Sequence, residues 1–306
     1  MNKIYSVPKQ LNVSGALQFL RMAEDIFYIR HKRIPDVRLD LDMVNEIDVF
    51  GQLLIYKYVE FTTKNECFYS PYIITNPFVD GKLKESGFQN LLNAFINSKD
   101  IDYRKLDYQE NGDSFFFAPI VLARDRNVNE KDKMTPKIEN FFRDSPKVVS
   151  MAMTVIGEVS LNFKEHAVED TQSVMVVSGN KRKIEISCAD TGVGIVSSLA
   201  NWYPDIKRKE KLIEKAIEKG VTSKKATNHM GFGLWIVNQL ATLTKGLFYV
   251  FSEGAYYFNR HGKIKSGLCS FWKGTIVYVN LPLSHPYTLK DIPGMDFDRS
   301  LKINFN

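Results

Sequence analysis

The sequence predicts an α/β (α+β) protein in two parts, a smaller N-terminal α/β unit followed by a larger C-terminal one. The first observation is length, because 306 residues correspond to roughly two domains of about 150 residues. The second is that short β-like runs alternate with stretches of helical periodicity along the chain. The third is charge: residues 1–143 carry 20 basic and 20 acidic side chains and residues 144–306 carry 21 and 15, so the net +6 lies in the second part.

Composition excludes several classes of protein. With 44% hydrophobic and 25% charged residues, the chain has neither the usage of a disordered protein nor that of a fibrous one. Its longest apolar run, Phe115–Ala123, contains Pro119 and is far shorter than the ~20 residues that span a membrane. The first residues lack the apolar stretch of a secretion signal, and three widely spaced cysteines indicate neither a disulfide framework nor a metal clip. We expect a soluble, cytoplasmic protein without a membrane segment.

Residues 1–123 form the predicted N-terminal unit. Val37–Met43 alternates apolar and polar side chains, which predicts a half-buried strand, and the apolar residues of Phe50–Thr63 recur at helical intervals. Further along, Lys84–Ile96 has the pattern of an amphipathic helix and Ser114–Ala123 that of a strand. Strands and helices in this order predict a small α/β domain.

A polar, charged stretch with two prolines, residues 124–146, is predicted to be a linker with one short helix around 138–142. Residues 147–283 form the predicted second unit, and residues 284–306 a C-terminal tail. Within the second unit the patterns predict a long helix at about 146–167, a strand at 183–189, a basic helix at 206–219, a helix at 234–244 and closing strands that end at 277–281.

The first segment that suggests chemistry is the long helix. Glu158, Asn162 and His166 recur every four residues and therefore share one face, beside the apolar stripe. A carboxylate that accepts a proton from water, one turn from an amide oxygen that ligates a hard cation, suits metal-assisted hydrolysis of a phosphate ester. The alternative is that the three side chains form an ordinary solvated face.

The second segment follows the strand at 183–189, where the sequence reads Asp-Thr-Gly-Val-Gly from Asp190. Gly192 and Gly194 allow the backbone to turn sharply and approach a ligand, and the carboxylate before them can accept a hydrogen bond from an amino group such as that of adenine. An ordinary tight turn is the alternative. We reject a dinucleotide fingerprint, because Ser197 stands where its third glycine would be and no clear second strand follows.

The third segment is a loop that leads into an apolar helix. Gly231 and Gly233 stand where that helix begins, so the free amides of its first turn can bind phosphate oxygens, with Lys224 and Lys225 nearby. The alternative is a flexible loop before a helix. The sequence contains no P-loop, HExxH or GxSxG motif, which leaves P-loop nucleotidases, zinc hydrolases and serine hydrolases without support.

In this order and at these separations, the three segments resemble the N, G1 and G2 boxes of the GHKL (histidine kinase-like) ATPase superfamily, which includes gyrase, heat-shock chaperone, histidine kinase and mismatch-repair ATPases. The resemblance spans about Ser145–Leu283, and Gly246–Ser252 and Gly274–Leu283 are similar to the closing strands of that family. It implies a Bergerat-type α/β sandwich, with helices on one face of a mixed sheet.

The resemblance also implies a role for each matching residue, with ATP and Mg²⁺ as cofactors. Glu158 would position or deprotonate the attacking water and Asn162 would coordinate Mg²⁺. Asp190 would bind the adenine amino group. The residues implied to complete the nucleotide site are Gly192, Gly194 and Thr275 around the adenine, and Lys224, Lys225, Gly231 and Gly233 in a lid over the phosphates.

Within the superfamily, the chain is most similar to anti-sigma-factor serine kinases and stand-alone signalling ATPases. No histidine lies in residues 124–146, as a histidine kinase would require, and 23 residues after Leu283 are too few for the transducer domain of a gyrase. In the N-terminal unit, Val37–Gly51 is similar to the strand-loop-helix of STAS-type domains. Only Val49 and Phe50 separate Asp48 from Gly51, so this loop offers no hydroxyl for phosphorylation.

These features predict an ATP/Mg²⁺-dependent signalling ATPase, whose STAS-like unit senses or docks a protein partner. Two alternatives stay open: a serine/threonine kinase acting on a STAS-like partner, and a nucleotide-binding scaffold that hydrolyses no ATP. A homodimer is also left open. We do not expect nucleic-acid binding, because residues 205–225 hold eight basic and four acidic side chains, most of the excess charge, in the segment expected to cover a nucleotide.

Overall fold

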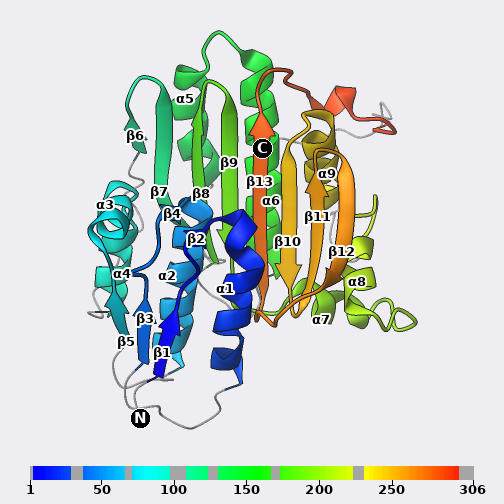
Figure 1. Cartoon of the computed structure of the whole chain (residues 1–306). Helices are drawn as coiled ribbons and strands as arrows, with labels where there is room; N and C mark the ends of the chain where they lie inside the picture. Colours follow the sequence, from blue (N-terminus) through cyan, green and yellow to red (C-terminus); the bar gives the residue numbers. More distant parts are fainter. Residues whose placement is uncertain are drawn as a thin grey trace.

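The computed structural model describes residues 3–28, 37–65, 71–96, 108–122, 130–166, 173–222 and 231–295. Within these residues the chain is a mixed α/β protein, built from an antiparallel sheet of eight strands, a parallel sheet of three and one short parallel pair (Figure 1). The predicted mixed α/β class is thus confirmed. Of the helices in these ranges, none combines the length and the apolarity that crossing a bilayer demands.

The eight-stranded sheet has the strand order β12-β11-β10-β13-β9-β8-β7-β6. Its strands are β6 (Tyr108–Glu110), β7 (Ser114–Leu122), β8 (Ser173–Asn180), β9 (Lys183–Ala189), β10 (Leu247–Ser252), β11 (Ala255–Arg260), β12 (Lys263–Leu268) and β13 (Thr275–Pro282). Every strand pairing described in this sheet is antiparallel, whereas the family resemblance implies a mixed sheet. Side chains of β8 alternate between two cores: Met175 and Val177 face one, and Val174 and Val176 the other.

Five helices cover one face of this sheet: α5 (Glu130–Phe141), α6 (Pro146–His166), α7 (Ile195–Ala200), α8 (Lys209–Ala216) and α9 (Gly233–Leu243). The longest, α6, buries the apolar stripe that its sequence predicts, including Val155, Val159 and Phe163. It packs against both β9 and α9. The stripe therefore fixes which side of α6 remains for the polar residues Glu158 and Asn162.

The opposite face of the sheet is covered by the N-terminal part of the chain. Helices α1 (Ala16–Ala23) and α2 (Val49–Lys64) share a core with β8, β9, β10 and β13. Every residue of α2 from Phe50 to Thr62 is buried, because the helix lies between the large sheet and the rest of the N-terminal unit. Both faces of the large sheet are thus covered, where the resemblance implies helices on one face only (Figure 1).

The N-terminal unit is built on the parallel sheet β1-β3-β5. Its elements are β1 (Lys3–Ser6), β2 (Gln10–Leu11), the 3-10 helix η1 (Val13–Gly15), α1, the 3-10 helix η2 (Glu24–Phe27), β3 (Val37–Asp40), β4 (Glu46–Ile47), α2, β5 (Pro71–Ile74), α3 (Pro77–Glu85) and α4 (Phe88–Ile96). The single helix predicted at 84–96 is therefore wrong, since the chain breaks at Gly87 with a φ of 74°. The strand before α2 is β4, and Asp48 caps the helix by accepting a hydrogen bond from the Gly51 N–H at 2.8 Å.

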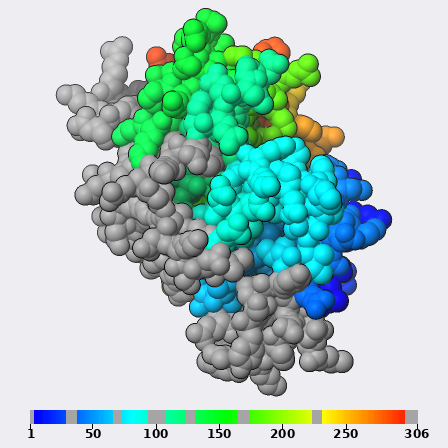
Figure 2. All heavy atoms as spheres, turned by 90° about the vertical axis from the view of Figure 1, so that its left-hand side faces the viewer, coloured from blue at the N-terminus to red at the C-terminus, as the bar shows by residue number. Residues whose placement is uncertain are grey.

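The domain boundary expected at residue 123 does not coincide with the boundary of the large sheet. Strands β6 and β7, which the sequence places in the first unit, belong to the large sheet, because β7 pairs with β8 from Ser114 opposite Asn180 to Leu122 opposite Ser173. The predicted linker contains α5, which is longer than the short helix expected there and packs on β7 and α6. A view from the side shows the cyan helices α3 and α4 lying against the green segments of the second unit (Figure 2), in keeping with the contact between α4 and β7.

Candidate functional site

The three sequence segments meet at one edge of the large sheet (Figure 1). Strand β9 ends at Ala189, opposite Val174 at the start of β8, which follows α6 in the chain. Strand β10 runs in the same direction as β9, because both are antiparallel to β13. Helix α9 is joined to the start of β10 by a short turn, so the beginning of α9 lies near the end of β10. The end of α6, the residue that follows β9 and the beginning of α9 therefore lie at the same edge.

Asp190 is held in a turn directly after β9 and is only 3% exposed. Its N–H donates to the Thr275 carbonyl at 3.0 Å, and its Oδ1 accepts a hydrogen bond from the Gly192 N–H at 2.7 Å. The second contact is an Asx turn, which fixes the orientation of the carboxylate. The structure thus brings Asp190, Gly192 and Thr275 together.

Gly274 is packed against this turn and was not singled out from the sequence. Its φ is 84°, and a Cβ at this position would lie 2.3 Å from Asp190 Oδ1 and 2.6 Å from the Asp190 carbonyl oxygen. Both the backbone conformation and the lack of space require glycine here. The one feature of the sequence that could have indicated Gly274 as a site residue is its position immediately before Thr275.

Gly194, at the other end of the turn, is enclosed by the β10–β11 turn. A Cβ there would lie 2.5 Å from both Ser252 Oγ and Glu253 Oε2. Ser252 Oγ accepts from the Ile195 N–H at 2.9 Å and donates to the Gly274 carbonyl at 2.8 Å, while Glu253 Oε2 accepts from the Ser197 N–H at 2.7 Å. Ser252 therefore links the residue after Gly194 to Gly274, and Glu253 links the β10–β11 turn to α7. The sequence did not indicate either residue.

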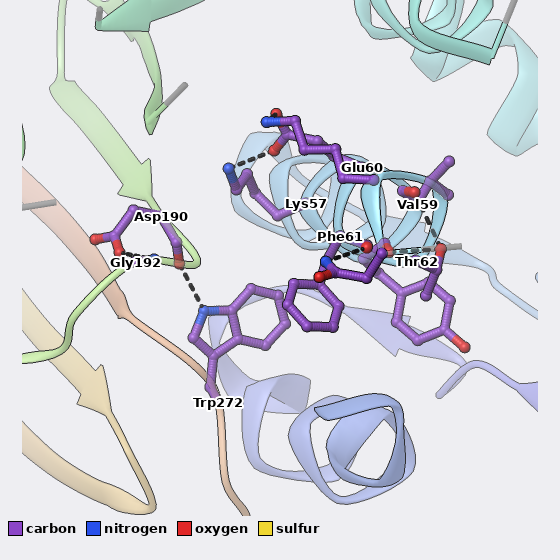
Figure 3. Close-up of polar contacts among 11 residues, drawn as sticks. Lys57, Val59, Glu60, Phe61, Thr62, Asp190, Gly192 and Trp272 are labelled. Atoms are coloured by element: carbon purple, nitrogen blue, oxygen red, sulfur yellow. Dashed lines mark hydrogen bonds and ion pairs between the residues drawn. The ribbon is translucent and has the colours of Figure 1, made fainter. Parts of the chain in front are cut away.

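Trp272 is a further residue that the sequence did not indicate. Its indole N–H donates to the Asp190 carbonyl at 3.0 Å (Figure 3). Its own carbonyl accepts from the Glu253 N–H at 3.0 Å. The side chain is fully buried. Trp272 thus supports Asp190 from the side that faces the N-terminal unit.

Glu158 and Asn162 lie against the beginning of α9. A Cβ on Gly233, the first residue of that helix, would lie 2.8 Å from Asn162 Nδ2 and 2.9 Å from Glu158 Oε2. Asn162 Nδ2 donates to the Glu158 carbonyl at 2.8 Å, so the amide oxygen is the atom available to a cation. Phe232 precedes Gly233 at the N-cap and offers no side-chain acceptor, which leaves the first amides of α9 for a ligand or water. The structure brings Glu158, Asn162 and Gly233 together.

Gly231 closes the base of the loop before α9. It has a φ of 69°, and its carbonyl accepts from the Gly220 N–H at 3.1 Å. Lys224 and Lys225, predicted to bind phosphate, lie outside the described residues, which resume at Gly231. Their placement stays a prediction.

The basic segment before this loop is largely paired with acidic neighbours. The helix predicted at 206–219 is shorter, α8 (Lys209–Ala216). Lys211 and Lys215 form ion pairs with Glu214 and Glu218 at 2.6 and 2.7 Å, and Lys209 Nζ donates to the Glu253 carbonyl at 2.9 Å. Lys211 and Lys215 are thus paired within the segment and Lys209 bonds to the β10–β11 turn, so the charge excess alone does not identify a phosphate site.

No cluster of three or more His, Cys, Asp or Glu side chains that could hold a metal occurs in the part of the chain that the structure describes. The acceptors at this edge are instead the Glu158 carboxylate and the Asn162 amide oxygen. Mg²⁺ commonly takes only one or two protein oxygens and obtains the rest from phosphates and water. The donor set therefore fits Mg²⁺ that arrives with a phosphate ligand better than a resident metal held by protein alone.

The chain matches no protein-family model, and no curated protein matches it either.

Proposed function

We propose that the chain binds ATP with Mg²⁺ at this edge of the large sheet and hydrolyses it as a regulatory ATPase. One observation carries the proposal: Gly233, at the start of α9, packs against both Glu158 and Asn162, at the same edge as Asp190. These residues are far apart in the sequence and belong to the three segments that resemble the boxes of GHKL ATPases. Their convergence is what a nucleotide site requires, since a base and a phosphate chain must be held together.

Asp190 would recognise the adenine. Its carboxylate is a hydrogen-bond acceptor of the kind that the exocyclic amino group needs, and the turn that holds it is rigid through Gly192 and Thr275. A base that lacks this donor would form one hydrogen bond fewer at the buried carboxylate, so the site would discriminate against it. Gly194 leaves room for the neighbouring turn and would shape the adenine side of the proposed site.

The beginning of α9 would hold the phosphates. Its first amides point out of the helix, and the positive end of the helix dipole favours an anion there. Asn162 would contribute its amide oxygen to Mg²⁺, and the ion, when bound, would neutralise charge on the phosphates. Glu158, one turn earlier on the same face, would orient water and accept its proton at a carboxylate oxygen.

The experiment uses the full chain with γ-labelled ATP and Mg²⁺. We expect saturable ATP binding and release of labelled phosphate, with binding lost in Asp190→Asn and retained in Asp144→Asn, which changes an exposed aspartate outside the site. Unchanged binding in Asp190→Asn would refute the proposal.

The same assay separates the alternatives. Label transferred to an added STAS-like partner protein would identify a serine/threonine kinase. Binding without turnover or transfer would identify a nucleotide-binding scaffold.

A further inference from the structure

The N-terminal unit reaches the proposed adenine site through the loop between β12 and β13. In this loop, the Phe271 N–H donates to Glu24 Oε1 in η2 at 2.8 Å, and Trp272 follows directly. The Phe27 ring packs edge-on to Trp272, with centroids 5.2 Å apart, and to Phe271 at 5.7 Å. One short segment, η2, therefore contacts both aromatic residues of the loop.

The contact continues into α2. Phe27 also packs on Phe61, near the C-terminal end of that helix, with ring centroids 4.7 Å apart. Figure 3 shows the Trp272 indole between the Asp190 turn and the part of α2 that carries Phe61. The Trp272 ring is fully buried, and a close-packed interior leaves it little room to absorb a movement of η2 or α2.

On the side away from the N-terminal unit, Trp272 forms hydrogen bonds with the site in addition to packing on it. The indole N–H is bonded to the Asp190 carbonyl and the Trp272 carbonyl to the Glu253 N–H, both at 3.0 Å. Glu253 in turn binds Ser197 at the start of α7. A displaced Trp272 must strain its bond to the Asp190 carbonyl or its bond to the Glu253 N–H, and so shift either the Asp190 turn or the turn beside Gly194.

We propose that Trp272 is a positioning residue, through which the N-terminal unit sets the place of the Asp190 carboxylate and so the affinity and base selectivity of the site. This inference rests on the proposed function and concerns how nucleotide binding is regulated. A partner that moves η2 would alter the recognition of adenine. Coupling is reciprocal, so bound nucleotide must also stabilise η2.

The test compares four variants of the full chain. Trp272→Phe removes the indole N–H, and Phe27→Leu and Glu24→Gln weaken the contact from the N-terminal side. Phe19→Leu is the matched control, because Phe19 is a buried phenylalanine of α1 that packs on Tyr58 instead of on the loop. Two readouts are used: the ratio of ATP to GTP affinity, and hydrogen exchange of the Gly192 amide, which is bonded to Asp190 Oδ1.

We expect the first three variants to lower the ATP/GTP affinity ratio by roughly fivefold, the effect of one hydrogen bond. Exchange at Gly192 should accelerate in the same three variants without ligand, and ATP should slow exchange at the Tyr28 amide, which is bonded to Asp25 in η2. Phe19→Leu should change neither readout. A loss of stability alone would not alter base selectivity.

Two results overturn the coupling: unchanged Gly192 exchange in all three variants, or an equal change in Phe19→Leu. If this happens while Asp190→Asn abolishes ATP binding, the proposed function stands and only the coupling fails. If Asp190→Asn binds ATP normally, the function fails, and Gly192 exchange still decides whether Trp272 transmits from the N-terminal unit.

Discussion

Gly274→Ala tests the packing on which the adenine site depends. The position combines a left-handed backbone, with a φ of 84°, and contact with Asp190. Gly262, in the turn between β11 and β12, has a φ of 83°, but the nearest atom to a Cβ there is Thr242 Cγ2 at 3.7 Å, which is ordinary contact. Gly262→Ala therefore has the same backbone strain without the clash, and the difference between the two variants isolates the contact with Asp190.

The size of the effect follows from the geometry. An alanine in the left-handed region costs about 1–2 kcal/mol in either variant. In Gly274→Ala the new Cβ would also lie 2.6 Å from the Asp190 carbonyl oxygen, so the turn must move and strain its bonds to Trp272 and Gly192. Two weakened hydrogen bonds add about 1–3 kcal/mol. We expect unfolding free energies lower by about 2–5 kcal/mol for Gly274→Ala and about 1–2 kcal/mol for Gly262→Ala.

Denaturant unfolding measures the stabilities, and calorimetric titration with ATP measures binding to the folded variants. Gly274→Ala should lose at least tenfold in affinity, because Asp190 is displaced, while Gly262→Ala should bind like the parent protein. Equal losses of stability and equal affinities in the two variants would refute the reasoning, since backbone strain alone would then explain both.

Three further predictions concern other parts of the molecule. Glu158→Gln should lower ATP turnover by about 10²–10⁴-fold with the dissociation constant of ATP nearly unchanged, because it removes a proton acceptor and keeps the shape of the side chain. The control is Glu139→Gln, which changes an exposed glutamate of α5. Full turnover in Glu158→Gln would refute the role assigned to Glu158. Gly233→Ala should keep or raise the melting temperature, since alanine favours a helix by up to about 1 kcal/mol, yet lose turnover, because the Cβ would displace the ends of Glu158 and Asn162. Burial raises the pKa of Asp48 to about 7, with nearby Glu185 adding to the effect and the Gly51 N–H and Lys183 opposing it. The folded state therefore binds the proton more tightly than the unfolded one, so between about pH 4 and 7 stability should fall as pH rises, by up to about 1.4 kcal/mol per unit. Asp48→Asn, which can still cap α2, should flatten that slope in urea titrations; an unaltered slope would show that Asp48 is not its source.

Of the second unit, the sequence predicts α6, β9, α9 and the closing strands, but it indicates neither β8 nor α7. α6 begins at Pro146 as expected and ends one residue before the predicted end, since its apolar stripe is continuous. What a local pattern cannot indicate is which strands pair. The apolar run of β7 identifies a strand but not its partners, and one partner is β8, more than fifty residues further along the chain.

The candidate site shows the same division. Glycines and charged residues within a short segment, such as Asp190 and Gly192, are visible because the turn is local. Ser252 and Trp272 act through a hydroxyl and an indole bonded to main-chain groups that are remote in sequence, so no spacing reveals them. The remote contact of Gly233 with Glu158 is foreseen only through the family resemblance, because nothing in the helix patterns fixes how α9 packs on α6.

The covered second face of the large sheet changes what the N-terminal unit can do. If that face were open, the unit would be a separate module on a tether, and it could act on the site only through a shared partner. Here residues 50–62 of α2 are buried, the helix packs against β8 and β9, and Phe61 near its end contacts Phe27, which touches the loop that holds Asp190. A rearrangement of the N-terminal unit must then either repack the core of the sheet, which a close-packed interior resists, or pass along the few aromatic contacts at its end. Movement through the aromatic contacts requires far less rearrangement than repacking the core. The Trp272 loop is therefore the place where a conformational change in one half of the chain can affect the other half.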